Sequence, residues 1–176
     1  MRILLTILLL LSGIFGFSQS LIEIRKEFHA AVLNSEESKA FHAYIHSVDK
    51  TSPTVLAYQA VSEAMLAQVS WNPFTKLSLV FKYDRLINEA VAQDEQNIEI
   101  RFLRLAIEYN LPSFLGLSTH MDEDLGLILE NMQSVQSMDV DPFYGRYIFY
   151  WLEHSDLCTH EQIAAMKETL ELQSSF

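Results

Sequence analysis

The chain has 176 residues, 23 of them acidic and 12 basic, so its formal net charge is −11. With 49% hydrophobic and 11% aromatic residues it has the composition of a folded protein, which excludes disorder along the whole chain. The acidity argues against a nucleic-acid partner, because phosphate contacts need a basic surface. Cys158 is the single cysteine, which excludes an internal disulfide, and we expect its side chain to be a small buried apolar group.

Residues 1–18 have the pattern of a secretory signal peptide. Arg2 supplies the positive charge, an apolar segment follows, and Gly16 and Ser18 are small residues at positions −3 and −1 of a cut before Gln19. The apolar stretch of about 15 residues is shorter than the roughly 20 that a membrane-spanning helix needs. We therefore predict an exported protein, periplasmic or secreted, in which residues 19–176 form one domain that does not stay inserted in the membrane. An uncleaved anchor is the alternative.

Glycine and proline usage predicts a helical domain. Of the five glycines, two lie in the predicted signal peptide, and the chain has none of the Asn-Gly or Asp-Gly pairs that are typical of β-hairpins. Three prolines directly follow a residue whose side chain can cap a helix, as in Ser52-Pro53, Asn72-Pro73 and Asp141-Pro142. The fourth, Pro112, is expected to end one helix and open the next.

Apolar residues recur at helical spacing between these positions. The expected stripes are, in chain order, Leu21, Ile24, Phe28 and Val32; after Ser35, Phe41, Tyr44, Ile45 and Val48; Val55, Tyr58, Val61, Met65 and Val69; Leu77, Val80, Phe81, Ile87 and Val91; Ile98, Phe102, Leu105, Ala106 and Tyr109; Leu125, Ile128, Leu129, Met132 and Val135. The acidic residues 122–124 are placed in the first turn of the sixth helix, where they complement the helix dipole.

Two further helices complete the prediction. The segment from Tyr147 to Leu152 is apolar nearly throughout, and we assign it to a helix because Asp141-Pro142 precedes it. Thr159 and Gln162 have the spacing of a capping box that opens a last helix through Leu172. The sequence thus predicts an all-α fold of about eight antiparallel helices joined by short turns.

Two resemblances accompany this pattern. The stretch from Ile87 to Ile100 resembles the junction between tetratricopeptide repeats, in which a helix ending in alanines meets an Asp-Pro-Asn-type turn, although Glu95 stands where that family has proline. This similarity covers about 45 residues and implies a tetratricopeptide-like or α/α superhelix-like helical hairpin. The segments 71–76, 99–104 and 112–116 resemble a group of uncharacterised small exported bacterial α-helical proteins, which implies a secreted helical domain and transfers no catalytic residue.

The polar cluster of Glu99, Arg101 and Arg104 is the first candidate binding site. On a helix the two arginines are neighbours, and two guanidinium groups beside an apolar face can hold a carboxylate or phosphate in bidentate fashion. The alternative is that they pair with acids of the chain and fix helix packing; the acids considered are Asp84, Glu108 and Asp124.

His42 and His46 form a weak candidate metal site, because their spacing puts both imidazoles on one face of a helix. Zinc needs a third and a fourth ligand, and His29 on the preceding helix is the nearby candidate. The alternative is two surface histidines. Among the aromatic residues near the C-terminus, Tyr144, Tyr147 and Trp151 are candidate groove residues, whereas Phe149 and Leu152 are assigned to the core. We predict no cofactor for any of these candidate sites.

Motifs of nucleotide-binding proteins, serine hydrolases and thiol oxidoreductases are missing from the sequence. We therefore expect a non-enzymatic binding or interaction module for a protein or peptide, and the net charge favours a basic partner surface. The alternative is a metal-binding protein or an enzyme of unrecognised type; self-association through Cys158 or the aromatic surface is a third. The candidate binding residues are Arg101, Arg104, Glu99, Trp71, Tyr147 and Trp151, with His42 and His46 for a metal.

Overall fold

The computed structural model of the chain describes residues 21–49, 52–131 and 142–173. All regular structure within these ranges is helical, which confirms the all-α prediction. Residues 21–33 form a helix, and α2 (Ser35–Ser47), α3 (Pro53–Val69), α4 (Pro73–Gln93), α5 (Ile98–Asn110), the 3-10 helix η1 (Ser113–Leu115), α6 (Met121–Glu130), α8 (Pro142–His154) and α9 (His160–Gln173) follow. The predicted signal peptide, the predicted cap Asp141 and the stripe residues Met132 and Val135 lie outside the described residues.

None of the helices within residues 21–49, 52–131 and 142–173 combines the length and the hydrophobicity that crossing a membrane requires.

Local capping chemistry starts the helices where the sequence predicts. The Ser52 side chain accepts a hydrogen bond from the Val55 N–H at 3.2 Å, with Pro53 as the first residue of α3. The Asn72 side chain caps α4 in the same way, accepting from two backbone N–H groups at 2.9 and 3.3 Å. Helix α2 begins one residue earlier than predicted, because Asn34 and not Ser35 is its N-cap.

The predicted capping box of α9 is confirmed. The backbone N–H of Thr159 donates to the Gln162 side chain at 2.8 Å, and the N–H of Gln162 donates to Thr159 Oγ1 at 3.2 Å. Each side chain thus satisfies a backbone donor that the first turn of a helix leaves unpaired.

The prediction for Pro112 is wrong in part. Helix α5 ends before it, but the chain after it makes a single 3-10 turn that ends at Gly116, whose φ is 64°. That left-handed conformation suits glycine and stops the turn. The loop that follows is tied back to α5, because the Glu108 carboxylate accepts hydrogen bonds from the backbone N–H and Nδ1 of His120 at 2.9 and 2.8 Å. The next α-helix therefore begins only at Met121.

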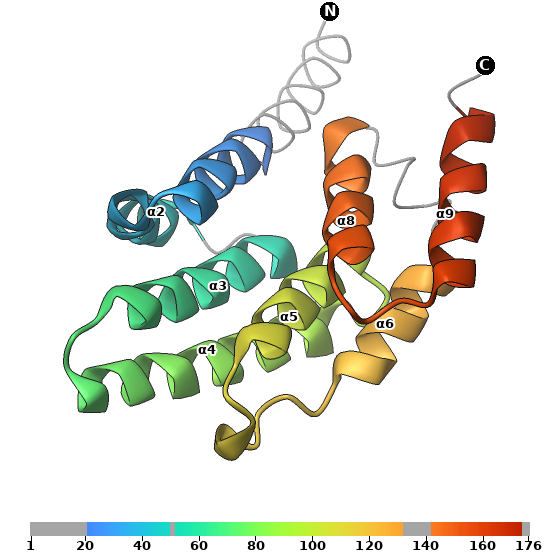
Figure 1. Cartoon of the computed structure of the whole chain (residues 1–176). Helices are drawn as coiled ribbons and strands as arrows, with labels where there is room; N and C mark the ends of the chain where they lie inside the picture. The colour runs from blue at the N-terminus through green and yellow to red at the C-terminus, as the bar shows by residue number, and fades with distance from the viewer. Residues whose placement is uncertain (1–20, 50–51, 132–141, 174–176) are drawn as a thin grey trace, which may run out of the picture.

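Helix α5 lies between two hydrophobic cores and contributes to both. Ile100 and Leu103 join the first core with residues of the 21–33 helix, α2, α3 and α4. Ile98, Phe102 and Leu105 join the second with residues of α6, α8 and α9. Figure 1 shows α3 and α4 side by side in opposite directions, joined by a turn at one edge of the molecule, with α8 and α9 at the other side.

Candidate functional site

Arg101 and Arg104 bind an internal acid rather than facing an open cleft. Both are buried on α5, and the carboxylate that they share is that of Asp124 on α6, which is also buried. Arg104 Nε and Nη2 each donate to Asp124 at 2.7 Å, and Arg101 Nη1 donates to it at 2.9 Å. Arg104 Nη1 donates to Asn88 at 3.0 Å. Of the two alternatives raised by the sequence, the structure has the pairing with Asp124.

Glu99 occupies a second buried ion pair. Arg25 of the 21–33 helix donates to both of its carboxylate oxygens, at 2.9 and 2.7 Å, and the Tyr58 hydroxyl of α3 donates to Oε1 at 2.7 Å. The Arg25 guanidinium also lies 5.0 Å from the ring centre of Tyr144 on α8. Burial, together with the charge of Glu99, raises the pKa of Tyr58 and of Tyr144 well above the ordinary value. Glu99 therefore links helices and is not presented to a ligand in solution.

Tyr147 and Trp151 are half-buried in an aromatic cluster. The ring of Phe102 on α5 meets both edge-on, with ring centres 5.8 Å from Tyr147 and 5.5 Å from Trp151. The His29 ring packs edge-on against Tyr147 at 4.2 Å. Such contacts add to the apolar burial that holds α8 in place. The prediction of Tyr144 as a groove residue is wrong. Its side chain is fully buried, because it packs in the second core and against the Arg25 guanidinium.

Trp71 is the predicted binding residue that the structure leaves open to solvent. Trp71 is 100% exposed, and on α4 Phe74, Leu77 and Phe81 are 83%, 40% and 52% exposed. Steps of three and four residues place the last three on one side of the helix. We call these four residues the α4 face. The sequence places Leu77 and Phe81 in one apolar stripe with Val80, but both are exposed whereas Val80 is buried.

The α4 face exists because the start of α4 extends beyond the core. Every residue from 71 to 78 is exposed, and burial in α4 begins at Val80. In many helices the residue before the N-cap packs against an apolar side chain at the fourth position of the helix. In α4 the fourth residue is Lys76, so Trp71 has no apolar partner there and stays exposed. Large apolar side chains exposed close together along the chain are typical of interaction sites in soluble proteins.

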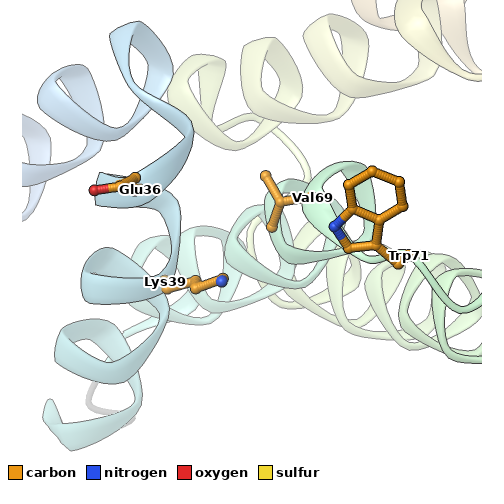
Figure 2. Close-up of a pocket in the computed structure, with 4 residues that line it drawn as sticks. All are labelled: Glu36, Lys39, Val69 and Trp71. Carbon is orange, nitrogen blue, oxygen red and sulfur yellow. The ribbon is translucent and has the colours of Figure 1, made fainter.

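A shallow open pocket adjoins the α4 face. It has a volume of about 420 Å³ and is lined by Glu36 and Lys39 of α2 and by Val69 and Trp71. Figure 2 shows Val69 and Trp71 on one side of this pocket and the two charged residues across from them on α2. A side chain of a partner that covers Trp71 can thus reach both an acidic and a basic group.

The charge around the α4 face differs from that of the whole chain. Residues 64–83 contain no Asp or Glu, although the chain has 23 acidic residues. The exposed Arg85 lies four residues after Phe81, on the same side of α4, whereas Lys76 projects from the opposite side of the helix, in line with Val80. Neither Lys76 nor Arg85 forms an ion pair with a described residue. The lysine of α4 that forms one is Lys82. The surface here is apolar, and Arg85 is the basic residue on its side of α4.

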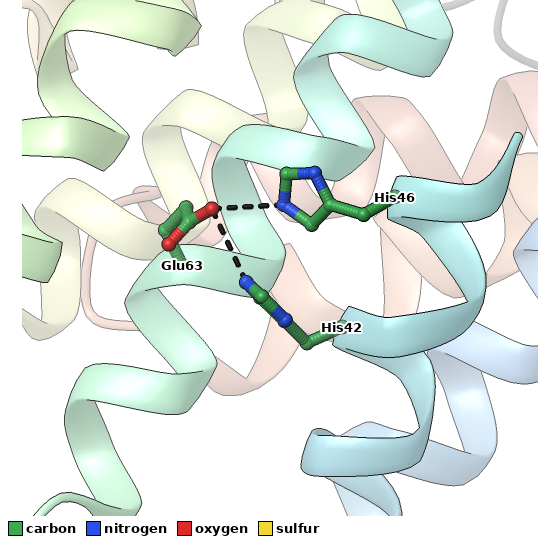
Figure 3. A group of neighbouring side chains, drawn as sticks. All are labelled: His42, His46 and Glu63. Atoms are coloured by element: carbon green, nitrogen blue, oxygen red, sulfur yellow. Dashed lines mark hydrogen bonds and ion pairs between the residues drawn. The ribbon is translucent and has the colours of Figure 1, made fainter. Parts of the chain in front are cut away.

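The predicted histidine pair is joined by an acid that the sequence analysis did not identify. His42 and His46 lie one turn apart on α2, and their Nε2 atoms are 3.2 and 2.8 Å from Oε1 of Glu63 on α3 (Figure 3). Lys82 Nζ is 2.6 Å from the same oxygen. His29, the third ligand considered from the sequence, packs on Tyr147 instead.

These contacts shift the protonation of the cluster. Burial raises the pKa of Glu63, but the hydrogen bond and charge of Lys82 and the imidazole of His42 outweigh it, so the pKa of Glu63 is lowered. Burial lowers the pKa of His46, and although the hydrogen bond with Glu63 raises it, the charges of His42 and Lys82 keep it below the ordinary value. Near neutral pH the cluster thus pairs an ionised carboxylate with a neutral His46 imidazole.

Comparison of the chain with protein-family models, with curated proteins and with solved structures yields no match. The resemblance to tetratricopeptide repeats and to small exported bacterial proteins stays a prediction.

Proposed function

We propose that this protein is an exported, non-enzymatic interaction module whose α4 face binds one amphipathic, acidic α-helix of a partner protein. The observation that carries the proposal is the full exposure of Trp71 and the near-full exposure of Phe74 in a row with Leu77 and Phe81. Tryptophan and other aromatic residues dominate binding energy at protein interfaces, where truncating one anchor costs about 2 kcal/mol or more.

The spacing of the α4 face favours a helical partner. Apolar anchors at positions i, i+3 and i+7 match the row that an amphipathic helix presents when it packs along another helix. From Phe74 to Arg85 the rise of 1.5 Å per residue gives a length of about 16 Å, which is roughly three helical turns of a partner. The partner helix then needs an apolar stripe of that length.

Local charge favours an acidic partner even though the chain as a whole is acidic. Arg85 lies at the face and Lys39 lines the adjoining pocket together with Glu36, whereas residues 64–83 contain no acid. Exposed charges separated by more than about 8 to 10 Å are largely screened at physiological salt, so the residues at the face decide the match. Asp or Glu beside the apolar stripe of the partner would complement them.

A selection from a displayed library of helical peptides tests the proposal on the purified chain. We expect enriched peptides to carry an apolar i, i+3, i+7 stripe with Asp or Glu beside it, and to lose about 30-fold in affinity on Phe74→Ala, which corresponds to about 2 kcal/mol. Phe114→Ala is the matched control, because Phe114 is an aromatic residue of η1 that is 84% exposed outside the α4 face, and we expect it to leave binding unchanged.

Four results would overturn this assignment. Enriched peptides that are basic, or that bind Phe74→Ala and wild type equally, would place recognition elsewhere. Binding of the wild type, but not of Phe74→Ala, to vesicles with anionic lipids would make the face a membrane-surface contact. Phe74-dependent dimerisation, measured by analytical ultracentrifugation, would make its partner a second copy of the chain.

A further inference from the structure

The cluster at Glu63 has the composition of a transition-metal site. Two imidazole nitrogens from α2 and one carboxylate from α3 supply ligand atoms that all lie within 4.8 Å of one another. Figure 3 shows both histidine rings directed at the carboxylate from the same side, one turn apart. Two histidines and one carboxylate are a ligand set that zinc uses when it keeps a fourth position open for water or substrate.

The distances fit one ion. Zinc binds nitrogen and oxygen at about 2.0–2.1 Å, so two ligand atoms of a tetrahedral site lie about 3.3 Å apart. In the structure Glu63 Oε1 is 3.2 Å from His42 Nε2 and 2.8 Å from His46 Nε2. Both histidines are also partly exposed, which gives an ion a route in from solvent.

The Glu63 carboxylate is built deeper than a surface salt bridge requires. Its side chain is fully buried, and its second oxygen, Oε2, has no hydrogen-bond partner among the described residues. A buried polar atom without a hydrogen-bond partner costs free energy. The buried acids Glu99 and Asp124, in contrast, have hydrogen bonds to both carboxylate oxygens. An ion held by both carboxylate oxygens of Glu63 would give Oε2 the partner that it lacks.

Lys82 supplies the positive charge at Glu63 in the absence of an ion. Its Nζ lies 2.6 Å from Oε1, yet its side chain is 44% exposed, so its flexible stem can carry the ammonium out to solvent. A divalent ion then replaces one positive charge with two beside the buried carboxylate. Lys82 is thus a competitor for the position of the ion, and its departure is part of binding.

We propose that His42, His46 and Glu63 form a binding site for one divalent transition-metal ion, with zinc as the best fit, and that Lys82 occupies the position of the ion when the site is empty. The site lies on α2 and α3 and uses none of the residues of the α4 face. The two proposals therefore stand or fall separately.

Zinc titration of the full chain without an affinity tag tests this site, after removal of metal with a chelator. We expect one zinc ion per chain, measured by competition with a chromophoric chelator, and we expect Co²⁺ to give the visible absorption of a tetrahedral site. His46→Gln keeps a polar side chain beside Glu63 but removes the imidazole, and it should weaken binding about tenfold or more.

Lys82→Met is the variant that separates this proposal from adventitious binding to histidine. Removing the competing ammonium should tighten zinc binding about tenfold, whereas zinc bound adventitiously to histidines elsewhere on the surface would not respond. His154→Ala is the matched control, since His154 lies on α8, and it should change neither stoichiometry nor affinity. Circular dichroism verifies that each variant is folded. Zinc binding that is unchanged in His46→Gln, or that weakens in folded Lys82→Met, would overturn the proposal, as would the absence of a stoichiometric ion in both wild type and Lys82→Met.

Discussion

Replacing Asp124 by asparagine removes the charge on which two buried arginines depend. The Asp124 side chain is 0% exposed and accepts three guanidinium hydrogen bonds, two from Arg104 and one from Arg101. After Asp124→Asn, the remaining acid at these arginines is Glu123, whose side chain is 59% exposed. The variant therefore leaves two cations in the interior with a partner that is largely in water.

The structure sets the size of the effect. Removing one partner of a buried ion pair costs about 3–5 kcal/mol, because an uncompensated charge stays behind. Removing an exposed partner costs about 0–1 kcal/mol, so Glu123→Gln is the matched control for Asp124→Asn. In a domain of this length each kcal/mol lowers Tm by about 2–4 °C, which predicts a loss of roughly 6–20 °C for Asp124→Asn and at most about 4 °C for Glu123→Gln.

Urea unfolding followed by far-ultraviolet circular dichroism measures both free energies of unfolding. We expect equal m-values for the three proteins and a midpoint that falls only for Asp124→Asn. A loss below about 1 kcal/mol for Asp124→Asn, or equal losses in the two variants, would refute the reasoning. Either result would mean that the buried arginines are stable without Asp124. The alternative from the sequence, that Arg101 and Arg104 hold an external anion, would then be favoured.

Two predictions concern pH. Burial raises the pKa of Tyr58, Tyr83 and Tyr144 well above the ordinary value, so these groups stay neutral in the folded chain while the unfolded chain ionises near pH 10. The contribution of these tyrosines to the free energy of unfolding is complete below pH 10 and is lost as the pH rises above it. Denaturation measured from pH 8 to 11 checks this. Tyrosines that titrate near pH 10 in the folded protein would contradict it. Burial also raises the pKa of the Cys158 thiol, so alkylation near neutral pH should be slower than in the urea-unfolded chain and should accelerate toward alkaline pH; equal rates would contradict this.

The helix starts could be predicted because their causes are local. At Pro53 and Pro73 a fixed φ and a capping side chain one residue earlier are enough to begin a helix, whatever packs on it later. Pro112 has the same fixed φ, but the path of the chain after it depends on the bonds from His120 to Glu108, which come from tertiary structure. No local pattern carries that information.

The α4 face could have been found in part from the sequence. Leu77 and Phe81 were placed in one stripe with Val80 and Ile87, but at about 100° per residue Phe81 lies on a different side of the helix from these two, and Leu77 lies at the edge between the two sides. Two apolar stripes on one helix predict two partners, and α3 covers one of them. The second stripe is exposed because of where the neighbouring helices end. The spacing of apolar residues in α4 gives no information about those ends.

Glu63 was missed for a related reason, although a signal exists. It is the single charged residue of α3, a helix that is otherwise apolar or neutral and buried along most of its length. An isolated acid in such a helix must find a partner from another helix, because burying a carboxylate alone is too costly. The partners themselves cannot be read from spacing, since His42 and His46 precede Glu63 by 21 and 17 residues.

The buried acids differ in the cations that hold them, and this difference decides which one is open to exchange. Glu99 and Asp124 are bound by buried arginines, whose planar charge is permanent and whose removal leaves an unpaired group in the interior. Glu63 is bound by a lysine on a long, partly exposed stem and by two imidazoles that reach solvent. Its positive partner can therefore leave without burying a charge, provided that another cation takes the position. Buried ion pairs thus fix α5 against its neighbours in two places, whereas the ion pair between α2 and α3 is the one at which we propose that an ion from solution enters.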